Sequence, residues 1–325
     1  MVKQWFLVFS LMGLIGSGYA NEPLGTPDLD DIEYPDDEPH SEAEIELGKK
    51  LYFDTRLSKN HQQSCATCHS PELGFGDGLR TSIGTMGGMV SRNAPHIYNL
   101  AWNVTFFWDG RADTLEEQAL GPIEAEGEMN LPLKEAVARL EAVPEYKKAF
   151  KDVYGVDAIE PEHIGRAIAA FERTVITMDS PFDRYIAGDK NAMDPSAIRG
   201  LALFQGKANC IDCHDGPNFT DNSFHHIGVK GDDLGRGAVA EDATMNKAFK
   251  TPGLRNVLLT APYMHDGSEG TLQEVVEFYN RGGDDKEGIS PLIKELNLTD
   301  QEMADLVAFM GALTEPIRIE RPEIP

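Results

Sequence analysis

The sequence predicts a mainly helical protein made of two tandem copies of one domain. Two copies of the pattern C-x-x-C-H, CATCH at 65–69 and CIDCH at 210–214, contain all four cysteines of the 325-residue chain. Other blocks of sequence recur in the same order after the two patterns. Apolar residues recur at helical spacing over 133–146 and 162–177, whereas alternating runs of β-branched residues are scarce.

The two C-x-x-C-H patterns predict two covalent c-type haems. In such a site two thiols form thioethers with the haem vinyl groups, and the adjacent imidazole binds the iron. A zinc site is one alternative, but the cysteine pairs lie farther apart than those of a zinc ribbon or finger. Two thioredoxin-like motifs are another, but neither would need a histidine after its second cysteine. The predicted haem residues are Cys65, Cys68, His69, Cys210, Cys213 and His214.

Residues 1–20 are predicted to be a cleaved export signal. Lys3 provides a positive start, residues 5–15 are mostly apolar, and Gly18-Tyr19-Ala20 has the small-x-small pattern of a cleavage site. The apolar stretch is too short to span a bilayer, which disfavours an uncleaved anchor. Because c-type haem is attached outside the bacterial cytoplasm, we expect a periplasmic protein with no stable membrane association.

The chain is strongly acidic. It has 29 basic and 54 acidic residues, and removing Lys3 with the signal changes the formal charge from −25 to −26. Such a surface disfavours nucleic acid and anionic membranes as partners and is suited to attracting a basic electron-donor protein. Residues 21–40 contain four prolines among many carboxylates, so we expect an acidic, extended or disordered lead-in.

The repeats divide the remaining chain into two domains, which we expect at 41–187 and 188–325. Gly-Asp-Lys-Asn at 188–191 indicates a connecting turn. Each domain begins with a short helix that leads to its haem motif. The two helices share a Gly-x-x-Leu pattern, which starts at Gly48 in the first copy and at Gly200 in the second.

Local signals mark the ends of the predicted helices. Ser41-Glu-Ala-Glu forms a capping box before the first helix, and Asp194-Pro195 gives the first helix of the second domain an N-cap followed by proline. Residues 299–313 are predicted to form a capped amphipathic helix that closes the second domain.

The later part of each domain repeats as well. Pro-x-x-x-Asn occurs at 95–99 and at 252–256. At the same distance from each proline follows Asp-Gly-x-x-x-Thr-Leu-x-Glu, within 108–117 and 265–274. Duplication of a one-haem domain accounts for this pattern.

The duplication allows one haem site to be compared with the other. A helical stretch of the second copy ends on Tyr279, and the corresponding residue of the first copy is Pro122. A tyrosine phenolate can bind ferric haem, whereas proline has no donor for iron. We therefore expect Tyr279 to complete the coordination of the haem on His214, and the haem on His69 to be open. The alternative for Tyr279 is a packed ring at a helix end.

Five stretches of the chain resemble the bacterial di-haem cytochrome c peroxidase and MauG family. They are Ser-Cys-Ala-Thr-Cys-His (64–69), Arg-Asn-Ala-Pro (92–95), Phe-Trp-Asp-Gly-Arg (107–111), Gly-Pro (121–122) and Leu-Thr-Ala-Pro-Tyr (259–263). The resemblance covers about residues 41–316. It implies two tandem cytochrome c-like domains, each with one covalent c-type haem. The first haem would use peroxide, and the second would store or relay oxidising equivalents.

The resemblance also implies roles for individual residues. Glu128 matches the family's distal acid–base glutamate, and Gln118 aligns with a residue that hydrogen-bonds it, while Pro122 lies on the distal face. Splitting H₂O₂ needs a group that moves a proton from one oxygen to the other, and a carboxylate in a partly apolar pocket does so near neutral pH. Trp108 matches the tryptophan that couples the two haems. Without the resemblance, Glu128 would be interpreted as a surface charge and Trp108 as a core residue.

Asn93, Thr260 and Pro262 match the inter-haem calcium site of the family. Carbonyl oxygens and waters supply the ligands there, as is typical of Ca²⁺. The resemblance therefore implies one Ca²⁺ ion beside the two haems.

The region around the first haem departs from one branch of the family. Reductively activated peroxidases have a histidine that blocks the first haem after Ser-Ile-Gly, whereas this chain has Thr85 after residues 82–84. We therefore expect the first haem to be open without prior reduction. Met86 and Met89 are alternative ligands in the same loop, although methionine in such a loop is more often a packing or surface residue.

Two further departures concern the second haem. Peroxidases of the family usually have methionine in place of Tyr279, and a phenolate should lower the reduction potential. This feature is MauG-like. MauG, however, oxidises a partner protein through a surface tryptophan that precedes the second haem motif, and this chain has Ala208 at that place.

Three functions remain open on these grounds. The first is a peroxidase that reduces H₂O₂ with electrons from a small cytochrome c or cupredoxin. The second is a MauG-like enzyme that uses peroxide to oxidise side chains of a partner protein, and the third is a non-catalytic di-haem electron carrier. Glu128 argues against the carrier. A homodimer is common in the peroxidases, but no feature of the sequence requires it.

Overall fold

The computed structural model describes residues 21–35 and 40–325, so the predicted export signal lies outside the described residues. The prediction of a mainly helical fold is confirmed for this part of the chain, which contains eleven α-helices and one two-stranded sheet. The helices of the first half are α1 (Glu42–Phe53), α2 (Cys65–Cys68), α3 (Leu115–Glu124), α4 (Leu133–Glu141), α5 (Pro144–Tyr154) and α6 (Pro161–Glu172). Those of the second half are α7 (Pro181–Ile186), α8 (Pro195–Gln205), α9 (Arg236–Ala240), α10 (Leu272–Asn280) and α11 (Asp300–Gly311). No helix in the described ranges combines the length and the apolar character needed to cross a membrane.

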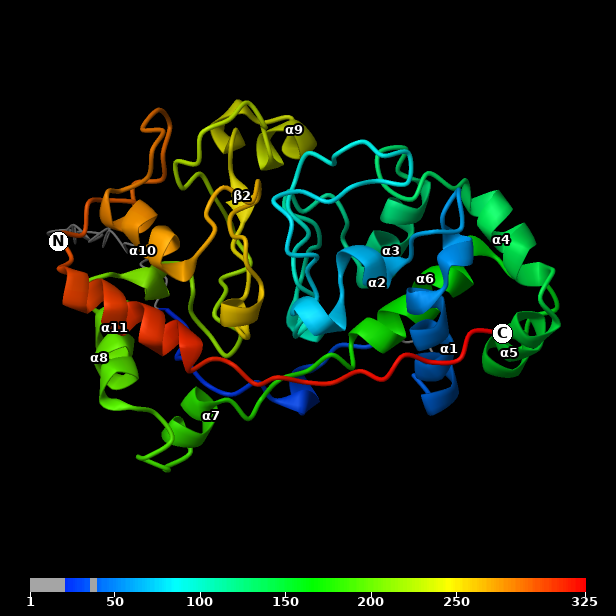
Figure 1. Cartoon of the computed structure of the whole chain (residues 1–325), viewed down its shortest axis with the longest axis horizontal. Helices are drawn as coiled ribbons and strands as arrows, with labels where there is room; N and C mark the ends of the chain where they lie inside the picture. Colours follow the sequence, from blue (N-terminus) through cyan, green and yellow to red (C-terminus); the bar gives the residue numbers. More distant parts are fainter. Residues whose placement is uncertain (1–20, 36–39) are drawn as a thin grey trace, which may run out of the picture.

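The two halves lie side by side, with α1 to α6 on the right of Figure 1 and α8, α10 and α11 on the left. Each half has its own hydrophobic core. The buried residues of the first core end at Val175, and those of the second begin at Phe182 in α7. Packing therefore changes a few residues before the turn at 188–191 on which the domain boundary was predicted, because the aromatic ring of Phe182 lies against the second core.

The same helix crossing occurs in both halves. In the first, α1 crosses α6 so closely that a Cβ on Gly48 would lie 1.6 Å from the carbonyl oxygen of Ala167. In the second, α8 crosses α11, and a Cβ on Gly200 would lie 1.9 Å from the carbonyl oxygen of Asp305. The repeated Gly-x-x-Leu pattern thus marks the point where two helix backbones meet without a side chain between them.

The sheet is small and lies beside the boundary of the two halves. It pairs β1 (Phe224–His225) with β2 (Phe249–Lys250) in antiparallel register, with Phe224 opposite Lys250. The backbone N–H of Lys250 donates to the carbonyl oxygen of Trp108 at 2.8 Å. This strand therefore ties the second half to the Trp108 segment of the first.

Both ends of the described chain cross from one half to the other, along the lower edge in Figure 1. In the lead-in, Arg255 donates to the carbonyl oxygen of Gly25, and Trp102 donates to that of Asp28. At the C-terminus, Ile317 and Ile319 pack against the first core. The described part of the lead-in therefore runs along both halves and is hydrogen-bonded to each of them through its backbone carbonyls.

Candidate functional site

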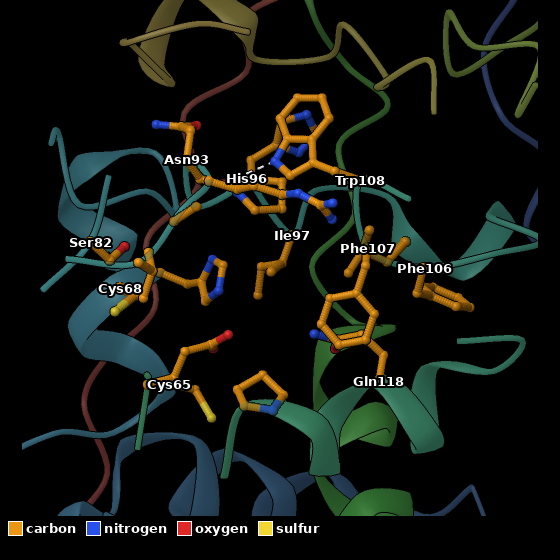
Figure 2. Close-up of a pocket in the computed structure, with 18 of the residues that line it drawn as sticks. Cys65, Cys68, Ser82, Asn93, His96, Ile97, Phe106, Phe107, Trp108 and Gln118 are labelled. Atoms are coloured by element: carbon orange, nitrogen blue, oxygen red, sulfur yellow. Dashed lines mark hydrogen bonds between the residues drawn. The ribbon is translucent and has the colours of Figure 1, made fainter. Parts of the chain in front are cut away.

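The first cavity has a volume of about 460 Å³ and lies between the CATCH motif and α3. Figure 2 shows Cys65 and Cys68 on one side of this space and Phe107 and Gln118 on the other. The structure brings together the residues that the sequence assigned to the first haem and its distal side. The cavity is lined by Cys65, Cys68, His69, Asn93, Trp108, Gln118, Pro122 and Glu128, among others.

The second cavity has a volume of about 190 Å³ and lies beside the CIDCH motif. It is lined by Cys210, Cys213, His214, Thr260, Pro262 and Tyr279, among others. Eight residues line both cavities and form the wall between them. They are Asn93, Ala94, Pro95, His96, Trp108, Lys250, Pro252 and Gly253.

The two motif histidines are held in the same way. His69 Nδ1 lies 3.3 Å from the carbonyl oxygen of Phe75, and His214 Nδ1 lies 2.9 Å from that of Phe219. Such a bond fixes the ring and leaves Nε2 available to an iron. Burial lowers the pKa of both imidazoles, which favours the neutral form that binds metal. The four cysteines are free thiols. These donors, beside two cavities, fit two covalent haems.

Trp108 stands in the wall between the cavities, and Figure 2 shows it beside Asn93. Its indole Nε1 donates to the carbonyl oxygen of Asn93 at 2.9 Å. The backbone N–H of Asn93 donates in turn to the carbonyl oxygen of His265 at 2.8 Å. Trp108 is therefore held in the contact between the two halves.

Glu128 lines the first cavity and is half-buried. Burial raises the pKa of its carboxyl group, and the charge of Arg111 partly opposes this effect. Gln118 and Pro122 lie on α3 and line the same cavity. No hydrogen bond within the described ranges joins Gln118 to Glu128, so the predicted link between them is not made by the side chains as they stand.

The loop that contains Thr85 is fastened to the Glu128 segment. The backbone N–H of Thr85 donates to the carbonyl oxygen of Glu128 at 2.7 Å, and its hydroxyl donates to Gln63 Oε1 at 2.5 Å. Met86 and Met89 are 70% and 69% exposed and do not line the cavity. Neither methionine is therefore placed to bind an iron on His69.

Tyr279 is the penultimate residue of α10 and lines the second cavity together with His214. Burial raises the pKa of its phenol, and the nearby Cys213 and Cys210 add to the effect. Binding of a phenolate to iron would release this proton, because metal ligation requires the deprotonated form. Ala208 also lines this cavity, and the one tryptophan among the lining residues is Trp108 of the shared wall.

The three residues predicted for calcium lie around one cavity. Asn93, Thr260 and Pro262 all line the second cavity. The amide nitrogen of Asn93 donates to the carbonyl oxygens of Leu79 and Arg80, at 3.1 and 3.3 Å. That orientation leaves Asn93 Oδ1, an oxygen of the kind that Ca²⁺ prefers, without a donor from the described residues.

The sequence missed two charged residues of the cavities. Glu172, on α6, is 5% exposed and lines the first cavity, and its Oε2 has no hydrogen-bond partner in the described chain. Burial raises its pKa to about 8. The burial of Glu172 could have been found in the sequence, because it lies four residues after buried Ile168 on α6 and residues four apart share one face of a helix. No periodic pattern in the sequence indicates that Lys250 of the shared wall is buried, because this residue lies on a strand of only two residues.

One cluster among the described residues has the composition of a metal site. Cys213 Sγ, a carboxylate oxygen of Asp221 and a ring nitrogen of His225 lie within 4.8 Å of one another. Asp221 accepts a hydrogen bond from His225 Nε2 at 2.7 Å. A thioether on Cys213 would occupy its sulfur, so this cluster belongs to the surroundings of the CIDCH motif.

Comparison with known proteins agrees with this arrangement. The family model for di-haem cytochrome c peroxidase matches residues 42–191. The methylamine utilization protein MauG of Methylorubrum extorquens is 44% identical over 299 residues, which are 90% of this chain and 85% of that protein. Cytochrome c551 peroxidase of Nitrosomonas europaea is 39% identical over 97% of this chain and 92% of its own length. A solved MauG-like protein associated with microbial copper homeostasis matches with a TM-score of 0.80 and 33% identity, covering 97% of this chain and 96% of that one. The chain belongs to the di-haem cytochrome c peroxidase family.

Proposed function

We propose that the protein is a periplasmic di-haem peroxidase that reduces H₂O₂ at an open haem, with electrons relayed through a second haem. The difference between the two cavities carries this proposal. The first contains a half-buried carboxylate, Glu128, and has Pro122 where the second has Tyr279. One cavity thus offers a proton-transfer group and has a proline, which has no donor for iron, at the position where the other has a tyrosine.

Glu128 moves the proton in this proposal. Reduction of H₂O₂ consumes two electrons and two protons and gives two molecules of water. The haems supply the iron that binds peroxide and the electrons that reduce it. The carboxylate of Glu128 takes the proton from the near oxygen of peroxide and gives it to the departing oxygen, so that the latter leaves as water. The raised pKa of Glu128 favours this exchange near neutral pH.

Trp108 provides the contact between the two haems. It lines both cavities, and its ring is held by the hydrogen bond to Asn93. The aromatic ring therefore shortens the path through which an electron passes from the haem on His214 to the haem on His69. A small cytochrome c or cupredoxin is the proposed donor, because the acidic chain attracts a basic partner.

The first haem would be open in the fully oxidised protein. Thr85 replaces the blocking histidine, its contacts with Glu128 and Gln63 fasten the loop, and Met86 and Met89 of the same loop do not line the cavity. The proposal also includes one Ca²⁺ held by Asn93, Thr260 and Pro262. Removing calcium with a chelator should then change the spectrum of the haems, and added Ca²⁺ should restore it.

A MauG-like oxidation of a partner protein is the second candidate. Tyr279 favours it, because a phenolate ligand lowers the potential and stabilises the oxidised haem. Ala208 counts against it, because alanine cannot pass an electron from a docked protein as a tryptophan would. We therefore place peroxide reduction first and retain protein oxidation as the alternative.

Stopped-flow absorbance tests the proposal directly. Fully oxidised protein is mixed with one equivalent of H₂O₂ without reductant, and we expect rapid bleaching of the Soret band. Reduced cytochrome c or cupredoxin added next should be oxidised at two equivalents per peroxide. Bleaching that appears only after one haem has been reduced would show that the first haem is blocked. Bleaching without oxidation of any donor would favour the second candidate.

A further inference from the structure

Lys250 is a buried lysine in the wall that the two cavities share. The residue is 8% exposed, and it lines both cavities. Within residues 21–35 and 40–325, its ammonium forms no ion pair and no hydrogen bond. Burial lowers its pKa to about 8, and Asp221 is the carboxylate whose charge acts against this. Asp221 is itself engaged by His225 at 2.7 Å.

The other cations of the two cavity walls differ from Lys250. Arg92 forms ion pairs with Asp109 and Asp233, at 2.6 and 2.7 Å. Lys247 pairs with Asp285 at 2.6 Å. Each of these side chains is neutralised by the protein itself, and Lys294, which also lines the second cavity, is exposed to solvent. A buried ammonium without a counter-charge is unfavourable. The charge of Lys250 therefore requires an anionic group to balance it.

The internal repeat shows which residue of the first copy corresponds to Lys250. Asn93-Ala-Pro in the first copy corresponds to Lys250-Thr-Pro in the second. The backbone hydrogen bonds of the two residues also correspond. Asn93 N–H donates to the carbonyl oxygen of His265, and Lys250 N–H donates to that of Trp108, both at 2.8 Å. Trp108 and His265 also occupy corresponding places in the repeat. Lys250 is therefore the counterpart of Asn93 on the other side of the wall.

We propose that the Lys250 ammonium binds a haem propionate where the two cavities meet, as a fixed cation at the place where the first copy has Asn93. Haem has two propionates on one edge, and each is a carboxylate that a buried ammonium can pair with. The proposal rests on the two-haem part of the proposed function and not on the reaction with peroxide.

A cation at this wall has a measurable effect on the haems. Reduction adds an electron, so a nearby positive charge favours the reduced form and raises the reduction potential. Low exposure means that the effect is weakly screened by salt. Lys250 therefore raises the potential of the haem whose propionate it binds.

The test compares three variants of the full holoprotein. Lys250→Met removes the charge and keeps the length, Lys250→Arg keeps the charge, and Lys148→Met removes a charge from a side chain on α5 that is 75% exposed. Haem content is measured first, and then the potential of each haem by spectroelectrochemistry with EPR. For Lys250→Met we expect the equilibrium constant for reduction of one haem to fall about tenfold, which is about 59 mV for a one-electron couple. The other two variants should stay within about threefold of the natural protein.

The outcomes separate the inference from the proposed function. The haem whose potential falls identifies the propionate that Lys250 binds. Unchanged potentials of both haems in Lys250→Met would overturn the inference, whereas fewer than two haems in the natural protein would overturn the two-haem function itself. If Lys250→Met does not mature, Lys250→Gln is examined by resonance Raman, where the propionate bending band should shift. An unchanged band, or loss of haem in Lys250→Arg as well, would show that the charge of Lys250 does not bind a propionate.

Discussion

Single buried carboxyl groups determine much of the expected pH behaviour. Glu128 and Glu172 both line the first cavity, and burial raises the pKa of each. The charge of Arg111 partly opposes this effect at Glu128, and that of Arg173 partly opposes it at Glu172, where Glu116 adds a like charge. Glu128 is half-buried and is the group that exchanges protons with peroxide in the proposed function, whereas Glu172 is 5% exposed and burial favours its neutral form.

Replacing Glu172 by Gln should make the protein more stable at alkaline pH. The folded pKa of about 8 lies above the ordinary value of 4.5, so the folded state binds the proton more tightly than the unfolded state. Stability of the natural protein should then fall as the pH rises from about 4.5 to 8. The variant lacks this loss, and at pH 8 it should gain on the order of 4 kcal/mol. Urea unfolding at pH 5 and pH 8 measures the difference, and an equal effect at both pH values would contradict the assignment.

Replacing Glu128 by Gln should slow peroxide turnover by roughly 10²–10⁴-fold while the protein keeps both haems. The carboxylate must be deprotonated to accept the first proton, and its pKa is raised. The acid limb of the pH–rate profile should therefore lie above pH 4.5 and disappear in the variant. Gln118→Leu provides a comparison on the same cavity. Normal turnover in Glu128→Gln would remove Glu128 from the proton transfer.

Replacing Tyr279 by Phe should leave the haem on His214 without its sixth ligand. The ring keeps its packing at the end of α10, and only the phenol oxygen is lost. Ferric EPR should show the loss of the low-spin signal of that haem. Tyr279→Met, which offers a thioether, should retain six-coordination with a higher potential. A low-spin signal that survives in Tyr279→Phe would exclude Tyr279 as the ligand.

At the scale of the elements, two kinds of contact position the site: close crossings of helices, and a loop that packs against the Glu128 segment. The close crossings of α1 with α6 and of α8 with α11 set the helix that leads to each haem motif. The loop at residues 82–90 rests on the Glu128 segment, where a Cβ on Gly84 would lie 1.9 Å from the carbonyl oxygen of Gly127. Backbone proximity at these places is what glycine provides, and a larger residue would separate the elements.

Replacing Gly200 by Ala should force α8 away from α11. The new Cβ would meet the carbonyl oxygen of Asp305 at 1.9 Å, so the two helices must separate. Overpacking of this kind costs roughly 1–3 kcal/mol, and we expect a loss of unfolding free energy at the upper end of that range. Gly88→Ala is the matched control, because a Cβ there would meet nothing within 4 Å. Equal stabilities of the two variants, measured by urea unfolding, would contradict the close crossing.

At the scale of the whole molecule, the two halves are joined by chain segments as well as by the wall between the two cavities. Residues 21–35 and the C-terminal tail both cross between the halves (Figure 1). Buried Arg255 donates to Asp183 of α7 as well as to Gly25, and so joins the lead-in to the second core. These two crossing segments fix the halves relative to each other, and they thereby fix the distance between the two cavities.

Deleting residues 317–325 should destabilise the first half more than the second. The deletion removes Ile317 and Ile319 from the first core and the ion pair between Arg321 and Glu72. Partial burial of two isoleucines is worth about 1–3 kcal/mol. Urea unfolding followed at the absorbance of each haem should show an earlier transition for the haem on His69. Coincident transitions at the natural midpoint would show that the tail contributes nothing.

The sequence by itself determined the features that are local in the chain. The two C-x-x-C-H motifs, the helix caps and the repeated Gly-x-x-Leu and Asp-Gly-x-x-x-Thr-Leu patterns depend on residues a few positions apart, and they predicted two haems, a helical fold and a duplication. Only the tertiary structure decided that Lys250 and Glu172 face the cavities, that Thr85 is bound to Glu128, and that both ends of the chain cross between the halves. Burial of a charge and contact between distant segments depend on how the elements pack, because no local spacing records which carbonyl or cavity a side chain will meet.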